Sequence, residues 1–361
     1  MRVCQHNQRS FLLGLSLVLL LGILGLAPAA AAGEFSIHQF VTGQVASGTP
    51  RLMYGITDTD LVIIDQDDPS NVTVVGPHGF SRIVWVRYNP LTDTLVGSAE
   101  TNAARVRQIV TIDRITGQAT PFGPTNRLLS PTFVDSRGEI VGTWADPPPN
   151  QRRLFTLDES GNATFLVGTS RDLDDSTYDS NHDIFYGINV VRRSSTVFDY
   201  VWWQVDLDTG ATTNAKIYRN GGRLSGYDPA RSAFYSINIF NQLTRIDASG
   251  GTLGAMTVVG EFGTDGPVRG VGFAPPPSAA AWLAALQDLV ASLGLPGGLK
   301  NALLAKLDNA LASLEAGNLT AAFNQIEAFK NQVEAQTGKK ISQEDAALLL
   351  AGADNVLNAP V

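Results

Sequence analysis

The residues best suited to chemistry in this sequence are acidic and basic side chains that recur at one position of five similar segments. The segments align on Tyr88, Val134, Tyr178, Tyr227 and Phe273. Four positions earlier stand Val84, Ser130, Asp174, Arg223 and Arg269, and Asp175 follows Asp174. Carboxylate and guanidinium groups gathered at one place suit a polar or anionic small ligand, although the same groups could equally form an internal salt bridge. The ligand-binding candidates are therefore Ser130, Asp174, Asp175, Arg223 and Arg269.

Other kinds of chemistry are poorly supported. The histidines outside the leader, His38, His78 and His182, are far apart, and the only cysteine is Cys4, whereas metal sites need clustered ligands. Asp174 and Asp175 are neighbours on a predicted strand, so they point to opposite faces and make a poor acid–base pair. The acidic segment 171–183 lacks the spacing of an EF-hand, which leaves only a structural calcium ion open. We expect no catalytic residue, no cofactor and no metal centre, and a non-enzyme is favoured.

A repeat determines where the candidates should lie. Five segments such as "IVTIDRITGQATPFG" (109 to 123) and "LFTLDESGNATFLVG" (154 to 168) each contain an apolar strand, a turn with Asp and Gly, and a second strand. The spacing of their aspartates, 41 to 48 residues, is typical of propeller blades. The aspartates are Asp65, Asp113, Asp158, Asp206 and Asp247. Each segment is predicted to form a β-hairpin in which the aspartate caps the turn.

The order of the strands indicates a closed ring. A middle strand such as "FYGIN" (185 to 189) precedes every hairpin, and an inner strand such as "SGYDPARS" (225 to 232) precedes four of the five middle strands. The missing inner strand is found at the end of the array, in "VRGVGFAPPPS" (268 to 278). We therefore predict about five four-stranded blades, with the last strand completing the first blade, so that no sheet edge stays open.

The repeat pattern, Leu/Ile-x-x-Ile-Asp-x-x-Thr-Gly-x-x-Thr-x-x-Gly, resembles the propeller repeats of secreted bacterial YVTN-like proteins. The resemblance covers residues 51 to 277. It implies the architecture and says little about function, because such rings include adhesins, ligand binders, lyases and hydrolases.

After residue 278 the composition changes to Ala, Leu, Lys and Glu, with leucines at helical spacing and Gly317 and Gly338 at helix ends. Short connections predict a small bundle of antiparallel helices, in which Ser342 caps the last helix. The segments "LVASLGLPGGLKNALLAKLDNALASLEAGN" and "AFNQIEAFKNQVEAQTGKKIS" resemble the FIMAH-type domain of secreted bacterial and archaeal proteins. The resemblance implies an accessory role in attachment or assembly. Lys330 departs from it, because an apolar residue is expected there and an exposed lysine would account for the difference.

The first 32 residues contain Arg2 and Arg9, an apolar run and the sequence "APAAAAG", which together predict a secretory signal peptide cleaved after Ala32. The predicted organisation is a signal peptide (1–32), an N-terminal segment (33–50), a propeller (51–277) and a helical bundle (278–361). The mature chain would have 24 Lys and Arg against 34 Asp and Glu, a net charge of −10. This charge disfavours nucleic acid as a partner, and no membrane span is expected in the mature chain.

Three functions are compatible with these patterns. The favoured one is an exported, non-enzymatic binding or scaffold protein, with a small polar or carbohydrate ligand at the propeller channel. The second is a propeller-type lyase or hydrolase that acts on such a substrate at the channel mouth. The third is a cell-envelope structural protein whose helices dock a protein partner. All three place the chain in a secreted, periplasmic or extracellular location.

Overall fold

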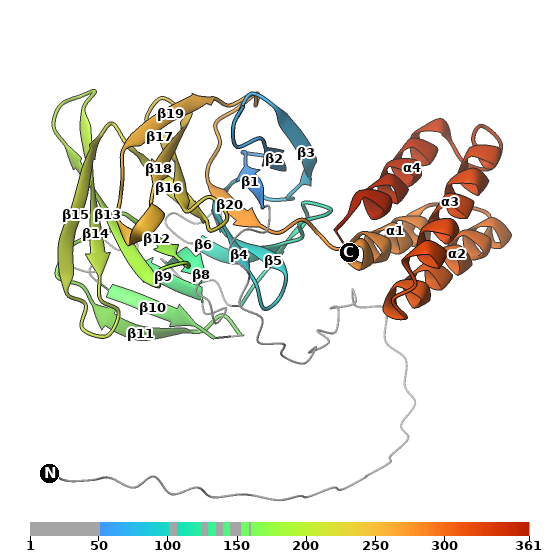
Figure 1. Ribbon diagram of the computed structural model, residues 1–361, viewed down its shortest axis with the longest axis horizontal. Coiled ribbons are helices and arrows are strands. Elements are labelled where there is room, and N and C mark those ends of the chain that lie inside the picture. The colour runs from blue at the N-terminus through green and yellow to red at the C-terminus, as the bar shows by residue number, and fades with distance from the viewer. Residues whose placement is uncertain are drawn as a thin grey trace, which may run out of the picture. The chain divides into compact units, whose positions relative to one another are not determined.

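The computed structural model describes residues 51–100, 107–123, 129–134, 140–144, 153–158 and 160–360. Within them lie five four-stranded antiparallel sheets followed by four helices (Figure 1). The predicted fold class, a five-bladed propeller with a C-terminal helical bundle, is confirmed. The predicted signal peptide and residues 33–50 lie outside the described part and remain predictions.

Each blade extends from an inner strand, next to the ring axis, to an outer strand. In that order the first blade contains β20 (Val271–Ala274), β1 (Leu52–Ile56), β2 (Asp60–Ile64) and β3 (Val72–Pro77). The second contains β4 (Ile83–Asn89), β5 (Thr94–Glu100), β6 (Arg107–Ile112) and β7 (Ala119–Pro121). The third contains β8 (Leu129–Val134), β9 (Ile140–Trp144), β10 (Arg153–Leu157) and β11 (Ala163–Gly168). The fourth contains β12 (Asp175–Asp179), β13 (Ile184–Arg192), β14 (Phe198–Val205) and β15 (Thr212–Arg219). The fifth contains β16 (Gly222–Asp228), β17 (Ala233–Asn238), β18 (Gln242–Asp247) and β19 (Met256–Glu261).

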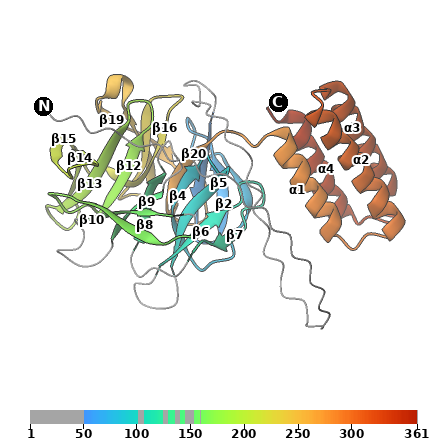
Figure 2. The ribbon, with the colours of Figure 1, turned by 90° about the horizontal axis from the view of Figure 1, so that it is seen from below.

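The ring closes as the order of strands predicted. Strand β20 pairs with β1, with Leu52 opposite Ala274 and Gly55 opposite Val271. The inner strands β4, β8, β12, β16 and β20 contact one another in turn around the ring (Figure 2). The last strand of the array therefore supplies the inner strand of the first blade, and every sheet has its full set of four strands.

The ring has two ends that differ in what the chain does there. At one end, which we call the mouth, the inner strands begin. At the other, the hairpin end, the two outer strands of each blade are joined by an aspartate turn. Each of the five aspartates accepts a backbone N–H from two residues further on, as Asp113 does from Ile115 at 2.8 Å. The predicted role of these aspartates in capping turns is thereby confirmed.

Glycines of these turns also make contacts between blades. Gly210 has a φ of 71°, and a Cβ added to it would lie 1.9 Å from the carbonyl oxygen of Gly168 in the preceding blade. Gly117 has a φ of 78° and meets the carbonyl oxygen of Gly76 in the same way, at 2.4 Å. A glycine is thus required in these turns for two reasons: its backbone conformation and the close approach of the preceding blade.

Apolar side chains fill the space between blades. A large aromatic group lies between the fourth and fifth blades, where the ring of Trp202 stands 5.2 Å from that of Phe234 and both are fully buried. The strand "FDYVWWQVD" thus uses Trp202 for inter-blade packing rather than for a surface site. Such rings bury a large apolar area at each interface, which holds neighbouring blades together.

The C-terminal part consists of α1 (Ala279–Ser292), α2 (Gly297–Glu315), α3 (Leu319–Gln336) and α4 (Gln343–Asn358), which pack around a shared apolar core. The backbone N–H of Asp345 donates to Ser342 Oγ at 3.0 Å, so the predicted cap is present. Gly317 and Gly338 follow the helix ends with a φ of 73°. Lys330, which departs from the expected pattern, donates to Asp354 of α4 at 2.7 Å and is only partly exposed. An ion pair between two helices thus replaces the expected apolar residue.

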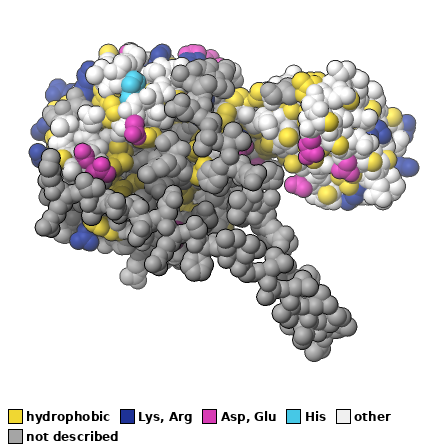
Figure 3. Space-filling model, turned by 60° about the horizontal axis from the view of Figure 1, so that its bottom comes forward, with side chains coloured by type: hydrophobic (Ala, Val, Ile, Leu, Met, Phe, Trp, Pro, Cys, Tyr) yellow, Lys and Arg dark blue, Asp and Glu magenta, His cyan; other side chains and the backbone are white. Residues whose placement is uncertain are grey.

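Apolar, acidic and basic side chains are intermingled on the surface of the helices that Figure 3 shows. Within the residues that the structure describes, no helix has the length and apolar character needed to cross a membrane.

Candidate functional site

The centre of the ring is filled by a buried arginine from β4. Arg87 is 6% exposed, and its Nη1 donates to the carbonyl oxygens of Val86 at 2.8 Å and Val271 at 3.2 Å. Its Nη2 lies 3.9 Å from Asp175 Oδ1, in the fourth blade. Burial lowers the pKa of Arg87, and the charge of Asp175 opposes that shift. Arg87 thus links the first, second and fourth blades across the ring axis.

Trp85 covers this ion pair on the mouth side. It stands at a bulge of β4 with a φ of 59°, and its indole Nε1 donates to Asp175 Oδ1 at 3.0 Å. The carboxylate of Asp175 is fully buried and also accepts the backbone N–H of Ser176 at 2.8 Å. The candidate Asp175 is therefore an anchor below the mouth surface, where its charge holds the inner strands together.

Asp174, the neighbouring candidate, faces another way. Its Oδ2 accepts the backbone N–H of Val190 at 2.7 Å and the side-chain amide of Asn189 at 3.4 Å. Burial raises the pKa of the Asp174 carboxyl, while the hydrogen bond from Val190 and the positive charge of Arg223 lower it. The charges of Asp174 and Arg223 thus act on each other.

Arg269, the third charged candidate, is occupied elsewhere. Its guanidinium forms a two-pronged ion pair with Asp58, with Nε to Oδ1 at 2.9 Å and Nη2 to Oδ2 at 3.2 Å. The hydrogen bond from Arg269 lowers the pKa of Asp58 below its ordinary value. Asp58 lies in the turn between β1 and β2, and the alignment of inner strands contained no signal for it.

Arg223 is the candidate that stays available. It is exposed at the start of β16, and it forms no salt bridge with any residue in the described part of the chain. Arg107 of β6 is a second guanidinium on which its charge acts, and the guanidinium carbon of Arg107 stands 4.7 Å from the centre of the Trp85 ring. Burial lowers the pKa of Arg107; the charge of Glu100 raises it, and those of Arg82 and Arg223 lower it further. Two positive charges from different blades therefore act on each other at the mouth.

The remaining partners complete this arrangement. Glu100 at the end of β5 accepts from Arg82 at 3.2 Å and lies 3.9 Å from Arg107. We call the whole set the mouth cluster: Asp58, Arg82, Glu100, Arg107, Asp174, Arg223 and Arg269. It contains four guanidinium groups and three carboxylates, and a fourth carboxylate, Asp172, acts on Asp174 through its charge, so the opposite charges nearly balance. Arg82, Glu100 and Arg107 lie outside the inner strands, which is why the alignment missed them.

Ser130 lies in β8, the inner strand of the third blade, and its side chain is outside the described residues. Among the residues that are described, no three or more His, Cys, Asp or Glu side chains are grouped so that they could hold a metal ion.

Comparison with known proteins identifies one part of the chain. Residues 279–358 match the FIMAH domain family. The chain is similar in structure to TolB from Acinetobacter baumannii, with 15% identity and a TM-score of 0.39 over 63% of this chain and 58% of that one. It is also similar to an oligogalacturonate lyase in complex with manganese, with 12% identity and a TM-score of 0.34 over 56% and 60%. A gluconolactonase from Xanthomonas campestris shows 11% identity and a TM-score of 0.36 over 59% and 75%.

The chain thus spans less than two thirds of the length of the first two of these structures. No curated protein matches the sequence. At these identities and TM-scores, nothing about this chain is inferred from the structural similarities.

Proposed function

We propose that this chain is an exported, non-enzymatic binding or scaffold protein of the YVTN-like kind, which holds a small polar or carbohydrate ligand at the mouth of its propeller. The observation that supports this most strongly is the position of Arg223. Its guanidinium is exposed and forms no salt bridge with the described residues, and its charge acts on a second guanidinium, that of Arg107. An anionic group between them would relieve their mutual repulsion and accept hydrogen bonds from Arg223.

The residues beneath this site support binding of a ligand at the mouth rather than its passage through the ring. Arg87, Asp175 and Trp85 close the ring centre by an ion pair and a hydrogen bond, so a ligand would rest on the mouth and not pass through it. The stacking of Arg107 on Trp85 fixes one side of the site in advance, which lowers the entropic cost of binding.

The experiment is a titration of the mature chain with glucuronate and, as a neutral control, glucose, followed by calorimetry. We expect glucuronate to bind more tightly, and Arg223→Gln to weaken its binding about tenfold, as expected for the loss of a charged hydrogen bond. Arg219→Gln is the matched control. Arg219 is an exposed arginine at the mouth end of the outer strand β15, and it is paired with Asp199. Equal affinity of wild type and Arg223→Gln for glucuronate, or no binding of either sugar, would contradict the proposal.

One observation favours the second candidate, a lyase or hydrolase. Asp174 is partly buried and its pKa is raised, which is the condition of many general acids. Asp175 cannot be the second carboxylate of such chemistry, since it is buried beneath Trp85 and paired with Arg87. The carboxylate whose charge acts on Asp174 is Asp172. If Asp174→Asn abolished the turnover of a polysaccharide while the protein stayed folded, the enzyme would replace the binding protein.

For the helices we propose an accessory role in attachment to a protein partner of the cell envelope. The match of residues 279–358 to the FIMAH family supports the view that the helices form a module distinct from the propeller. Leu348 of α4 is 51% exposed and Leu319 of α3 is 38% exposed, so apolar contacts are available. Retention of the full chain on envelope fractions should fall in the double variant Leu319→Gln, Leu348→Gln. Unchanged retention would exclude these two side chains from the attachment.

A further inference from the structure

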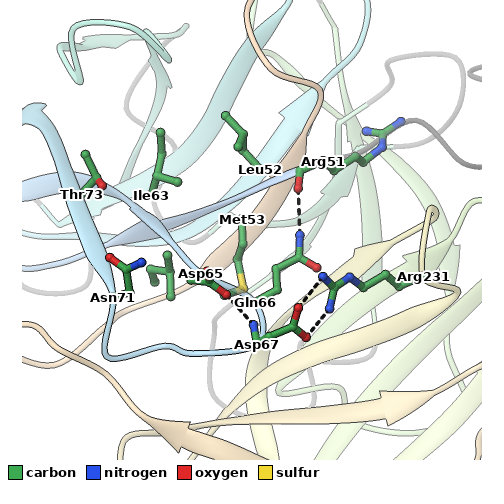
Figure 4. A pocket seen from close by; sticks show the side chains of 11 residues that line it. Arg51, Leu52, Met53, Ile63, Asp65, Gln66, Asp67, Asn71, Thr73 and Arg231 are labelled. Carbon is green, nitrogen blue, oxygen red and sulfur yellow. Dashed lines mark hydrogen bonds and ion pairs between the residues drawn. The ribbon is translucent and has the colours of Figure 1, made fainter. Parts of the chain in front are cut away.

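A cavity lies at the hairpin end of the first blade, away from the mouth cluster. It measures about 320 Å³ and is formed by β1, by the turn between β2 and β3, and by Arg231 from the fifth blade (Figure 4). Strand β1 begins at this cavity with Leu52 and ends at the mouth with Ile56, so the ring separates the two places. The volume is at the lower end of the roughly 300–1,000 Å³ of small-molecule sites. We call it the blade-one pocket.

Gln66 in this pocket has a polar atom without a partner. The residue is 9% exposed, and its Nε2 donates to the carbonyl oxygen of Arg51 at 2.8 Å. That bond fixes the orientation of the amide, because a flipped amide would set its oxygen against the Arg51 carbonyl. The other atom, Oε1, is buried and accepts no hydrogen bond. Buried carbonyl oxygens are rarely left unpaired, and none of the described residues donates to this one, so a ligand donor that displaces the groups covering it would find a free acceptor.

The walls around Gln66 are held in place from two blades. Arg231 donates from Nη1 and Nη2 to the two carboxylate oxygens of Asp67, at 2.6 and 2.8 Å. Figure 4 shows this fork beside Gln66, with Arg51 on the far side of the amide. The guanidinium of Arg51 lies 6.0 Å from the centre of the Tyr88 ring and forms no ion pair with the described residues. Arg51 also lines the pocket, so its guanidinium is the second group that we expect a ligand to contact.

The charges and surfaces of the pocket define the ligand class. Two arginines and two aspartates, Asp65 and Asp67, balance each other, so an ion would gain little. A metal ion is disfavoured because Asp67 is occupied by Arg231 and Asp65 Oδ1 already accepts two backbone N–H groups. Leu52 and Met53 add an apolar side. Donors, acceptors and an apolar wall within a small volume suit a neutral molecule with several hydroxyl groups.

We propose that the blade-one pocket binds one neutral sugar, either a free monosaccharide or the terminal residue of a glycan, with a sugar hydroxyl donating to Gln66 Oε1. This site is independent of the mouth: it requires no anionic group, and its binding should depend little on salt, unlike binding governed by Arg223. The proposal can thus fail while the proposed function stands, and the reverse also holds.

The test uses the mature chain in two arms. Glucose, galactose, mannose and N-acetylglucosamine are titrated as free sugars by calorimetry, and a glycan array presents the same sugars as terminal residues. We expect one of them to bind, with about tenfold weaker binding in Gln66→Met and in Arg51→Met. Gln118→Met is the matched control, since Gln118 lies in the corresponding turn of the second blade and is exposed.

Each outcome decides something. Binding of the free sugar supports a monosaccharide site, and binding on the array alone supports a glycan terminus. Thermal unfolding of every variant shows whether the fold is kept, and Arg51→Met keeps the test valid if Gln66→Met does not fold. The proposal is overturned if no sugar binds in either arm, or if affinity is unchanged in both Gln66→Met and Arg51→Met.

Discussion

The hairpin end and the mouth of this propeller are built by opposite means. At the hairpin end the same contacts recur from blade to blade: an aspartate caps each turn, and glycines such as Gly117 and Gly210 press against the preceding blade. At the mouth the equivalent positions differ, so that Arg269 pairs with Asp58, Asp174 hydrogen-bonds to Val190, and Arg223 is left exposed. Repeated contacts stabilise the ring, whereas the positions that vary provide a surface for recognition.

The largest expected effect concerns a position that differs between blades and nevertheless stabilises the ring. The position of Arg87 carries a residue other than arginine in each of the other inner strands, yet Arg87 is buried. We therefore expect Arg87→Met to lower the free energy of unfolding by about 3–5 kcal/mol, because it leaves Asp175 without its cation. Urea denaturation followed by circular dichroism measures this. Arg82→Met, which breaks an exposed pair with Glu100, should cost less than about 1 kcal/mol. Equal losses of unfolding free energy in the two variants would show that the buried ion pair stabilises the ring no more than the pair at the mouth does.

The next effect would sharpen the role of the hairpin end. Gly210→Ala combines the strain of a left-handed backbone, about 1–2 kcal/mol, with overpacking of about 1–3 kcal/mol against Gly168, so we expect a loss of about 3 kcal/mol. Gly250→Ala is the matched control, because its φ is 75° but nothing lies within 4 Å of an added Cβ. It should lose only the strain. If thermal and urea unfolding gave the same loss for both, the close approach of blades would be energetically unimportant.

The smallest effect concerns pH at the connection between the first two blades. His78 is fully buried, its Nδ1 accepts the backbone N–H of Phe80 at 3.2 Å, and burial lowers its pKa. A lowered folded pKa means that the unfolded chain takes up the proton first. Stability is therefore complete above the unfolded value of about 6.5 and falls as the pH drops from there toward the folded pKa.

Urea unfolding at pH 7.5 and 5.5, values that straddle the unfolded pKa of about 6.5, measures this dependence. His78→Asn retains an acceptor for the Phe80 N–H but does not titrate, so the part of the pH dependence that is due to His78 should disappear. The same loss of stability on acidification in wild type and His78→Asn would assign the effect to other groups.

Much of the fold could be predicted because the same strand pattern and the same aspartate turn recur in every blade. The spacing of the aspartates indicated the blades, and the displaced segment "VRGVGFAPPPS" indicated the closure by β20. The candidate site was less accessible. Three inner strands, β4, β8 and β16, contain a register shift, which moves the residues before it by one place relative to an alignment on Tyr88, Val134 and Tyr227.

Residues from the outer parts of blades escaped the alignment altogether. Arg107 lies at the start of an outer strand, Glu100 at the end of a middle strand and Asp58 in a turn, where no repeat pattern marks them. Gln66 escaped for another reason: nothing in its sequence context indicates that one amide oxygen is buried without a donor. Such features depend on where side chains from different blades meet, which a sequence period does not encode.

The pairing of β1 with β20 has a consequence for the order in which the molecule can form. Until the segment ending at Ala274 has been synthesised, β1 has an unpaired edge and the first blade is one strand short. The loop that must then close includes every other blade, and long loops make such pairings slow. We therefore expect a nascent chain to stay open, and able to pair wrongly, for nearly the whole time that its propeller is being made.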